Sequence, residues 1–262
     1  DNQLLFYPQV NASLKVVGDW MLFYTGLEGS LDQNSYRDFT NENSFLSPTL
    51  FIKPTNKQFD LYAGLKGKLS NYISYNLKGS YVSEKDKGLF RSNPYDETIL
   101  VQDEYQYGNS FGVVYDKLKT LRFFGELKAD FSKNISFGIN GTFSSFTTTD
   151  EKEAWNLPAL KMGTNLNVTI SPKWYAGAEA FFVGERKDLV QKTNVLTLLP
   201  EMNVQKLDSY FDVNANVGYK YSDRFTAFLR MNNIANQAYQ KWLNYPVQSF
   251  QIMLGGNYKF DF

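Results

Sequence analysis

The feature that most constrains the fold of this chain is a hydrophobic pattern with a period of two residues. In the stretch Leu121–Phe131, apolar residues and glycine fill the odd positions, whereas the charged residues Arg122, Glu126, Lys128 and Asp130 all fall at even ones. Successive side chains of a β-strand point to opposite faces of its sheet. The pattern therefore predicts a strand with one apolar face and one polar face.

Eleven segments share this alternation. A tilted strand of roughly 9–11 residues crosses a bilayer, so each segment is long enough to do so. We predict strands over Pro8–Val17, Trp20–Ser30, Gln58–Leu69, Ile73–Val82, Thr120–Phe131, Ile135–Phe146, Ala159–Ile170, Trp174–Gly184, Ser209–Tyr221, Phe225–Asn233 and Ser249–Phe262.

Charged residues test the alternation, because every charge in a segment must fall on the polar face. The test is strict where a segment holds several charges, as in Gln58–Leu69, and all of them there share one parity. We expect the polar face to line a lumen that carries Asp60, Lys66, Lys68, Arg122, Glu126, Lys128, Asp130, Glu179, Asp212 and Arg230.

The connections alternate between short and long. Four short ones place a serine after an apolar residue, at Ser70, Ser132, Ser171 and Ser222, and the fifth is Gly18-Asp19, a two-residue hairpin signal. The long ones are Leu31–Lys57, Ser83–Lys119, Thr147–Pro158, Glu185–Asp208 and Ile234–Gln248. Short turns on one side and long loops on the other are typical of outer-membrane barrels.

Two stretches inside the longest loop, Thr98–Gln102 and Phe111–Tyr115, are also strand-like. We expect them to form a hairpin outside the membrane.

A soluble β-sandwich also alternates, but its strands average about 5–6 residues, half the length of these segments. Eleven long strands enclose a lumen too wide for side chains to fill, so the apolar face must lie outside, against lipid. Aromatic residues beside the short turns, such as Trp20, Tyr72, Trp174 and Tyr221, fit an interfacial girdle. We therefore predict an all-β, transmembrane, antiparallel up-and-down β-barrel.

Composition excludes several functional classes. Lys and Arg total 27, and so do Asp and Glu, so the chain lacks the basic excess expected of a nucleic-acid partner. It contains no His and no Cys, which removes ordinary zinc sites, Ser-His-Asp and Cys-His nucleophiles and disulfides. We expect a protein that is not an enzyme and needs no cofactor.

The last segment ends in an aromatic ladder, in which Leu254, Gly256, Tyr258, Phe260 and Phe262 alternate with polar residues. This ending resembles the signal by which many bacterial outer-membrane barrels are recognised, and it implies the barrel-assembly machinery as a partner. An ordinary last strand would look the same.

A second motif precedes that strand, with Asn233, Asn236 and Tyr239 in the pattern Asn-x-x-Asn-x-x-Tyr. Followed by a loop and an aromatic-ended strand, it resembles the C-terminal end of TonB-dependent outer-membrane receptors. Such receptors have a 22-strand barrel, an N-terminal plug and a TonB-box peptide, whereas eleven strands make about half of that barrel. Complete bacterial barrels have an even number of strands, so we expect residues 1–262 to be the C-terminal part of the barrel, without the plug.

The resemblance implies energised uptake of a scarce ligand of the siderophore, oligosaccharide or vitamin class. It also implies a multi-pass protein of the bacterial outer membrane. Its partners would be outer-membrane lipid, the remainder of the barrel and plug, and a TonB-type energy-coupling protein. The lumen charges would hold a plug or merely solvate a water-filled wall. Two alternatives stay open, a passive porin and a structural or accessory barrel of a larger complex.

Residues of the long loops suggest two further kinds of site. Oxygen ligands for calcium are available at Asp96, Glu97, Asp103 and Glu104, although an acidic loop in water is the simpler reading. Aromatic rings that could stack a sugar are present at Tyr95, Tyr105, Tyr107 and Trp155.

Overall fold

The computed structural model describes residues 4–94, 108–193 and 199–260, and their regular structure is almost entirely β. Eleven strands form one sheet: β1 (Gln9–Val17), β2 (Met21–Asp32), β3 (Thr55–Lys68), β4 (Ile73–Ser92), β5 (Phe111–Ser132), β6 (Ile135–Thr147), β7 (Leu160–Thr169), β8 (Trp174–Val183), β11 (Tyr210–Lys220), β12 (Phe225–Asn232) and β15 (Gln251–Tyr258). Each predicted segment overlaps one of these strands.

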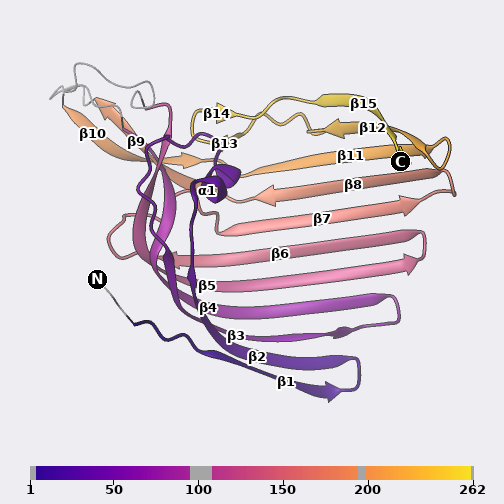
Figure 1. Cartoon of the computed structure of the whole chain (residues 1–262), viewed down its shortest axis with the longest axis horizontal. Coiled ribbons are helices and arrows are strands. Elements are labelled where there is room, and N and C mark those ends of the chain that lie inside the picture. The colour runs from indigo at the N-terminus through magenta and orange to yellow at the C-terminus, as the bar shows by residue number, and fades with distance from the viewer. Residues whose placement is uncertain (1–3, 95–107, 194–198, 261–262) are drawn as a thin grey trace.

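The sheet is an antiparallel meander in which every strand pairs with its neighbours in the chain, apart from inserted hairpins (Figure 1). The short turns lie at one end of the strands and the long connections at the other (Figure 1). This is the predicted layout. No helix in the described residues is long and apolar enough to cross a membrane.

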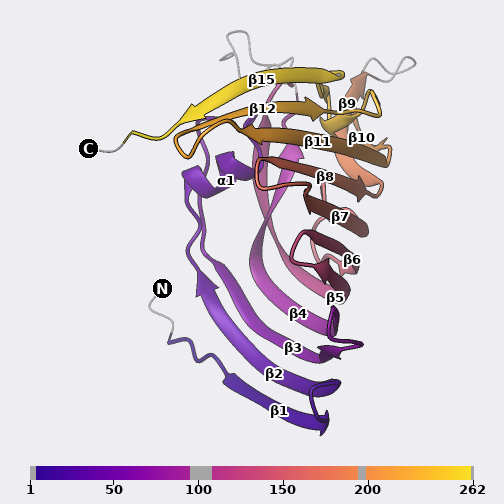
Figure 2. The ribbon, with the colours of Figure 1, turned by 90° about the vertical axis from the view of Figure 1, so that its right-hand side faces the viewer.

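The sheet is strongly curved, and the strands follow one another around an open arc (Figure 2). Cavities lie on the face that carries the predicted lumen charges, so we identify this face with the concave side of the arc. Within the described residues, β1 and β15 each pair along one side only. The structure therefore shows a curved wall rather than a closed cylinder.

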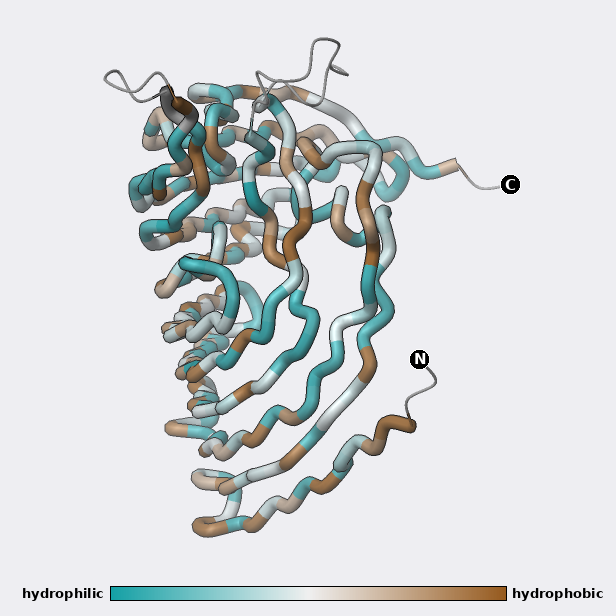
Figure 3. Tube along the Cα trace, turned by 90° about the vertical axis from the view of Figure 1, so that its left-hand side faces the viewer, coloured by the Kyte–Doolittle hydropathy of each residue, from teal (hydrophilic) through white to brown (hydrophobic). Residues whose placement is uncertain are grey.

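The register builds two chemically different faces. Leu27, Leu61, Tyr81 and Leu121 stand opposite one another across β2 to β5 and form an apolar row. The alternation of hydrophilic and hydrophobic residues is visible along the strands in Figure 3. In this row, Leu61 is 51% exposed, Leu121 44% and Tyr81 39%. Soluble monomers rarely expose large continuous apolar surfaces, so this face agrees with the prediction of an apolar outer side.

The serines of the short turns hold those turns closed. The hydroxyl of Ser70 accepts a hydrogen bond from the backbone N–H of Tyr72 at 3.2 Å, and Ser132 accepts one from Asn134 at 3.1 Å. Ser171 and Ser222 make the same contact. A serine side chain that bonds the backbone two residues on favours a tight turn, which explains the recurrence of serine.

The prediction for the longest loop is wrong in one respect. Phe111–Tyr115 does not belong to a separate hairpin; it is the first part of β5 and pairs with Gly88–Ser92 of β4. Both strands continue well beyond the predicted membrane-spanning segments. The other half of the predicted hairpin, Thr98–Gln102, lies outside the described residues.

The remaining long connections also contain structure that the alternation did not predict. The helix α1 (Tyr36–Glu42) lies between β2 and β3, and its N-cap Ser35 accepts a hydrogen bond from the Asp38 N–H at 3.1 Å. Two hairpins follow, formed by β9 (Arg186–Thr193) with β10 (Pro200–Leu207) and by β13 (Gln240–Trp242) with β14 (Tyr245–Pro246).

Adjacent residues near the middle of β6 provide a matched test of the two faces. Ile139 stands opposite Leu127 on the apolar face, and its neighbour Asn140 stands opposite Glu126 on the charged face. We expect Ile139→Lys to lower the free energy of unfolding in lipid vesicles by about 2–4 kcal/mol, because a lysine near the midplane of the bilayer must leave water. Asn140→Lys should leave it almost unchanged. Equal effects in a denaturant titration would contradict the assignment of the faces.

Candidate functional site

The concave face carries all ten charged residues that were predicted to line a lumen. Only two of them pair with each other, because the Lys128 ammonium lies 3.0 Å from the Glu126 carboxylate. Others contact neutral groups: Asn214 donates a hydrogen bond to Glu179 at 3.3 Å, and the Lys66 ammonium lies 5.4 Å from the centre of the Tyr24 ring. Most of these ten charges therefore have no ion-pair partner among the described residues of the wall.

Above this wall, the long connections pack into one outer assembly around the projecting ends of β4 and β5. One apolar cluster joins α1, the two strand ends, β10 and the segment of β13, through Phe39, Phe90, Phe111, Leu207 and Trp242. The Trp242 ring meets Phe90 and Phe111 edge-on, at centroid distances of 5.6 and 5.4 Å. Segments that are far apart in the sequence thus share a buried core.

A second cluster anchors the β6–β7 connection to the same strands. Trp155 is 1% exposed and packs with Leu89, Leu118 and Leu189, while its indole N–H donates to the Glu151 carboxylate at 2.7 Å. The idea that Trp155 stacks a ligand is therefore wrong, because its ring is enclosed. The other loop candidates for stacking or calcium, Tyr95, Asp96, Glu97, Asp103, Glu104, Tyr105 and Tyr107, lie outside the described residues.

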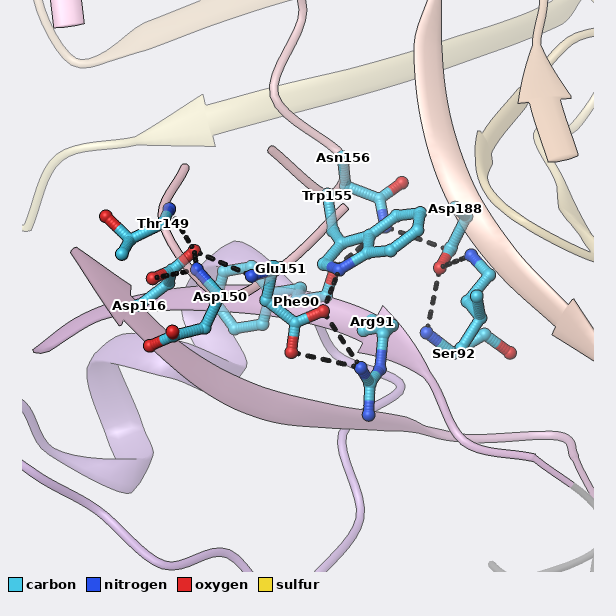
Figure 4. Close-up of polar contacts among 11 residues, drawn as sticks. Phe90, Arg91, Ser92, Asp116, Thr149, Asp150, Glu151, Trp155, Asn156 and Asp188 are labelled. Carbon is cyan, nitrogen blue, oxygen red and sulfur yellow. Dashed lines mark hydrogen bonds and ion pairs between the residues drawn. The ribbon is translucent and has the colours of Figure 1, made fainter. Parts of the chain in front are cut away.

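Asp188 is the polar centre of the outer assembly (Figure 4). Its carboxylate is fully buried and accepts hydrogen bonds from the Ser92 N–H at 2.9 Å, the Leu189 N–H at 2.7 Å and the Asn156 side-chain amide at 2.9 Å. Burial raises the pKa of Asp188, although these donors and the charge of Arg91 oppose the rise. One side chain therefore links β4, β9 and the β6–β7 connection.

A second buried carboxylate holds the start of the β6–β7 connection. Asp116 accepts hydrogen bonds from the backbone N–H groups of Thr149, Asp150 and Glu151, each at 3.0 Å (Figure 4). Burial alone would raise the pKa of Asp116, but these donors and the Lys117 N–H outweigh it and hold the pKa below its ordinary value of 3.8. Its neighbour Glu151 also pairs with Arg91 at 3.0 Å.

Arg186 fixes the β13 segment at the rim of the wall. It is 5% exposed, and its guanidinium donates to the carbonyl of Lys241 and, at 2.8 Å, to that of Gln240. Burial lowers the pKa of Arg186. Beneath it, the rings of Tyr210 and Tyr239 stack 3.8 Å apart, and the Tyr239 hydroxyl donates to Asp212 at 2.7 Å.

The Asn-x-x-Asn-x-x-Tyr motif has a structural explanation. Asn233 and Asn236 both adopt the left-handed conformation, with φ of 46° and 48°, which asparagine tolerates better than most residues. The Asn233 amide donates to the carbonyls of Gln237 at 3.1 Å and Gln248 at 3.0 Å, and Asn236 accepts from the Phe250 N–H at 3.0 Å. The motif therefore ties the end of β12 to the entry of β15.

The predicted aromatic ladder at the end of the chain is described only in part. Tyr258 and Phe260 meet edge-on at a centroid distance of 4.8 Å, and both are more than half exposed on the apolar face. Phe262 lies outside the described residues, and the role of the ladder in assembly stays a prediction.

Solved structures provide the decisive comparison. The structure of the FpvAI–pyocin S2 complex aligns with 98% of this chain at a TM-score of 0.68 and 14% sequence identity. The ferric-catecholate import receptor Fiu from E. coli K12 aligns with 96% at 0.62 and 12% identity, and the siderophore receptor PirA from Acinetobacter baumannii with 97% at 0.62 and 14%. The chain has the fold of TonB-dependent receptor barrels.

The chain spans only part of the length of these solved structures. It covers 32%, 34% and 41% of the length of those three chains. No protein-family model and no curated protein matches its sequence. The similarity to receptor barrels is therefore seen in the structure, although the sequence alone matches no family model and no curated protein.

The lowered pKa of Asp116 predicts that the hydrogen bonds anchoring the β6–β7 connection become weaker at low pH. An acid whose folded pKa lies below its unfolded value stabilises the fold above the unfolded pKa and loses that contribution as the pH falls through the folded pKa. We expect hydrogen-exchange protection of the Thr149, Asp150 and Glu151 amides to drop as the pH falls below about 5, and to be lost once the pH passes below the folded pKa of Asp116, which lies under 3.8.

Two variants separate this effect from general acid unfolding. Asp116→Asn should weaken the same protection at neutral pH and flatten its pH dependence, whereas Asp150→Asn, which changes an exposed side chain, should behave like the parent protein. Protection that falls equally along all strands as the pH drops would contradict a local role for Asp116.

Proposed function

We propose that this chain forms part of the barrel wall of a TonB-dependent receptor in the bacterial outer membrane. In this role it takes part in the energised uptake of a scarce ligand of the siderophore, oligosaccharide or vitamin class. The observation that carries the proposal is a curved eleven-stranded wall, apolar outside and charged inside, in the arrangement found in receptor barrels. Outer-membrane lipid would cover the apolar face.

The free edges of the sheet indicate the first partner. Hydrocarbon offers no hydrogen bonds to an unpaired strand edge, so a sheet in a bilayer has to close. β1 and β15 each show one unpaired side in the described residues. We infer that further strands join these two edges and complete a barrel of the 22-strand type. Residues 1–262 would then be wall throughout, with the plug supplied by another part of the receptor.

The unpaired charges of the concave face support the idea that a plug fills the lumen during part of the transport cycle. A plug that meets mixed charges across water can be held by hydrogen bonds and ion pairs and still be released when a TonB-type energy-coupling protein acts on it. We propose that this wall binds and guides, and that it performs no covalent chemistry. The barrel-assembly machinery would insert it through the aromatic ladder of β15.

The structure of the outer assembly is suited to binding a ligand that arrives from outside the cell. Loops that share a buried core keep a defined shape, because moving one of them would break contacts of several. The anchors at Asp188, Asp116 and Arg186 hold four of the five long connections to the wall or to a neighbouring connection. Such an assembly presents a preorganised surface to an incoming ligand.

Transport by cells tests the proposed function. A strain that carries the gene and a strain that lacks it would be compared for accumulation of radiolabelled ferric siderophores, cobalamin and maltotriose, each with and without an uncoupler of the proton gradient. We expect accumulation of one ligand class that requires both the gene and the gradient.

Two other outcomes would contradict the proposal and favour the alternatives. The first is a steady open conductance of the full-length protein in planar bilayers, with uptake unaffected by the uncoupler, as for a passive porin. The second is stoichiometric co-purification with other outer-membrane proteins and no ligand accumulation, as for an accessory barrel.

A further inference from the structure

A cavity of about 460 Å³ lies on the concave face, where β4, β5, β6 and β7 approach the outer assembly. We call it the wall pocket and define it by Lys78, Ser80, Arg122, Phe124, Ser144 and Lys161. The register makes it a continuous patch, because Lys78, Phe124, Thr142 and Lys161 stand side by side across the four strands. The loop residues Leu157 and Pro158 complete its lining.

The charge in the wall pocket is strongly one-sided. Four cations line it, and the only carboxylate among its lining residues, Glu84, is 6% exposed and already pairs with Lys87 at 3.1 Å. Lys78, Arg122 and Lys161 form no ion pair with any residue that the structure describes. Three positive charges therefore face one cavity without an ion-pair partner, although positive and negative charges are equal in number over the whole chain.

One of these cations is held in position by an aromatic ring. The Lys78 ammonium lies 4.0 Å from the centre of the Tyr62 ring, close enough for a cation–π contact. Tyr62 is fixed in turn, since its hydroxyl donates to Glu28 at 2.7 Å. Lys78 is therefore oriented while its charge remains available for a ligand.

Hydroxyl groups add neutral donors between the cations. Ser80, Thr120, Thr142 and Ser144 line the wall pocket, and their hydroxyls have no hydrogen-bond partner among residues 4–94, 108–193 and 199–260. Thr120 is 1% exposed and Ser80 and Ser144 are each 6% exposed, so these groups sit deep in the wall. A group with several acceptor oxygens would satisfy donors and cations together.

The lining of the wall pocket also has an apolar part. Leu118, Phe124, Phe146, Leu157 and Pro158 line it, and Leu118 and Pro158 are buried. A small inorganic anion would leave this surface uncovered. A ligand with an acidic group and an apolar, ring-sized body would cover both parts, in keeping with ligand sites that combine apolar walls with a few placed polar groups.

A second cavity on the same face has a different chemistry. It measures about 520 Å³ and lies across β7, β8, β11 and β12. Its lining holds the side-chain amides of Asn165, Asn167, Asn214 and Asn216 and one charge of each sign, Glu179 and Arg230. This second cavity therefore has no excess of positive charge, unlike the wall pocket.

We propose that the wall pocket binds an anionic organic ligand, with an aromatic carboxylate or a similar acid as its charged end. The proposal deepens the proposed function, on which it rests for access of the ligand from the lumen, and it names the substrate class as anionic. Lys78, Arg122 and Lys161 supply the charge, the four hydroxyls supply hydrogen bonds, and Phe124 and Phe146 contact the ring.

A pair of probes of equal shape tests the charge requirement. Full-length protein purified from outer membranes in a non-ionic detergent would be titrated calorimetrically with 2-naphthoate and with 2-naphthamide, which differ in their charge. We expect 2-naphthoate to bind at least tenfold more tightly. In Arg122→Gln/Lys161→Gln this preference should disappear, and in the matched control Lys66→Gln/Lys68→Gln, which removes two lumen cations outside the wall pocket, it should remain.

Three results would overturn the proposal: equal affinity for the two probes, no binding of either because another part of the protein fills the wall pocket, or an unchanged preference in Arg122→Gln/Lys161→Gln. The transport assay separates this failure from that of the proposed function. Energised uptake by a protein that shows no preference would reject the anionic pocket alone. A preference for 2-naphthoate that the variants abolish, in a protein without energised uptake, would support the pocket and reject the receptor role.

Discussion

The whole structure depends on pairing backbone hydrogen bonds between neighbouring strands while alternate side chains meet two different solvents. A strand can cross hydrocarbon only if each of its N–H and C=O groups finds a partner within the protein. Antiparallel pairing from β1 to β15 supplies those partners across the sheet. The strict parity of the side chains then fixes which residues touch lipid, because a slip of one residue would reverse the two faces. Charges inside and leucines outside are one consequence of this single register.

The outer assembly obeys a different constraint. Where β4 and β5 leave the predicted membrane-spanning region, loops cover both sides of them, and the successive residues Leu89 and Phe90 are both buried. Here the fold is stabilised as in a soluble protein, by an apolar core and by buried carboxylates such as Asp188 whose hydrogen bonds are satisfied. One end of each of these two strands therefore belongs to the lipid-facing wall. The other end belongs to the buried core of the outer assembly, which is surrounded by water.

This difference explains what could be predicted from the sequence. The eleven wall strands were predictable because the two faces meet different solvents, which imposes a period of two on the sequence, as in Leu121–Phe131. The outer half of β4 was not, since burial on both faces removes the alternation. β9 was missed for a related reason: its charged residues Arg186 and Asp188 look like loop residues until the structure shows them buried. The wall pocket was also invisible, because it combines residues of four strands that only the register places together.

The central claim is that one face of this wall meets lipid and the other meets water. The chain contains no cysteine, so single cysteines can be introduced and spin-labelled without competing thiols. Labels at successive positions from Ile139 to Phe143 in β6 would be exposed, in lipid vesicles, to oxygen, which partitions into lipid, and to a water-soluble nickel chelate. Oxygen should collide best with labels at Ile139, Gly141 and Phe143, and the chelate with labels at Asn140 and Thr142. Similar accessibility to the chelate at all five positions would contradict the assignment of one face to lipid and the other to water.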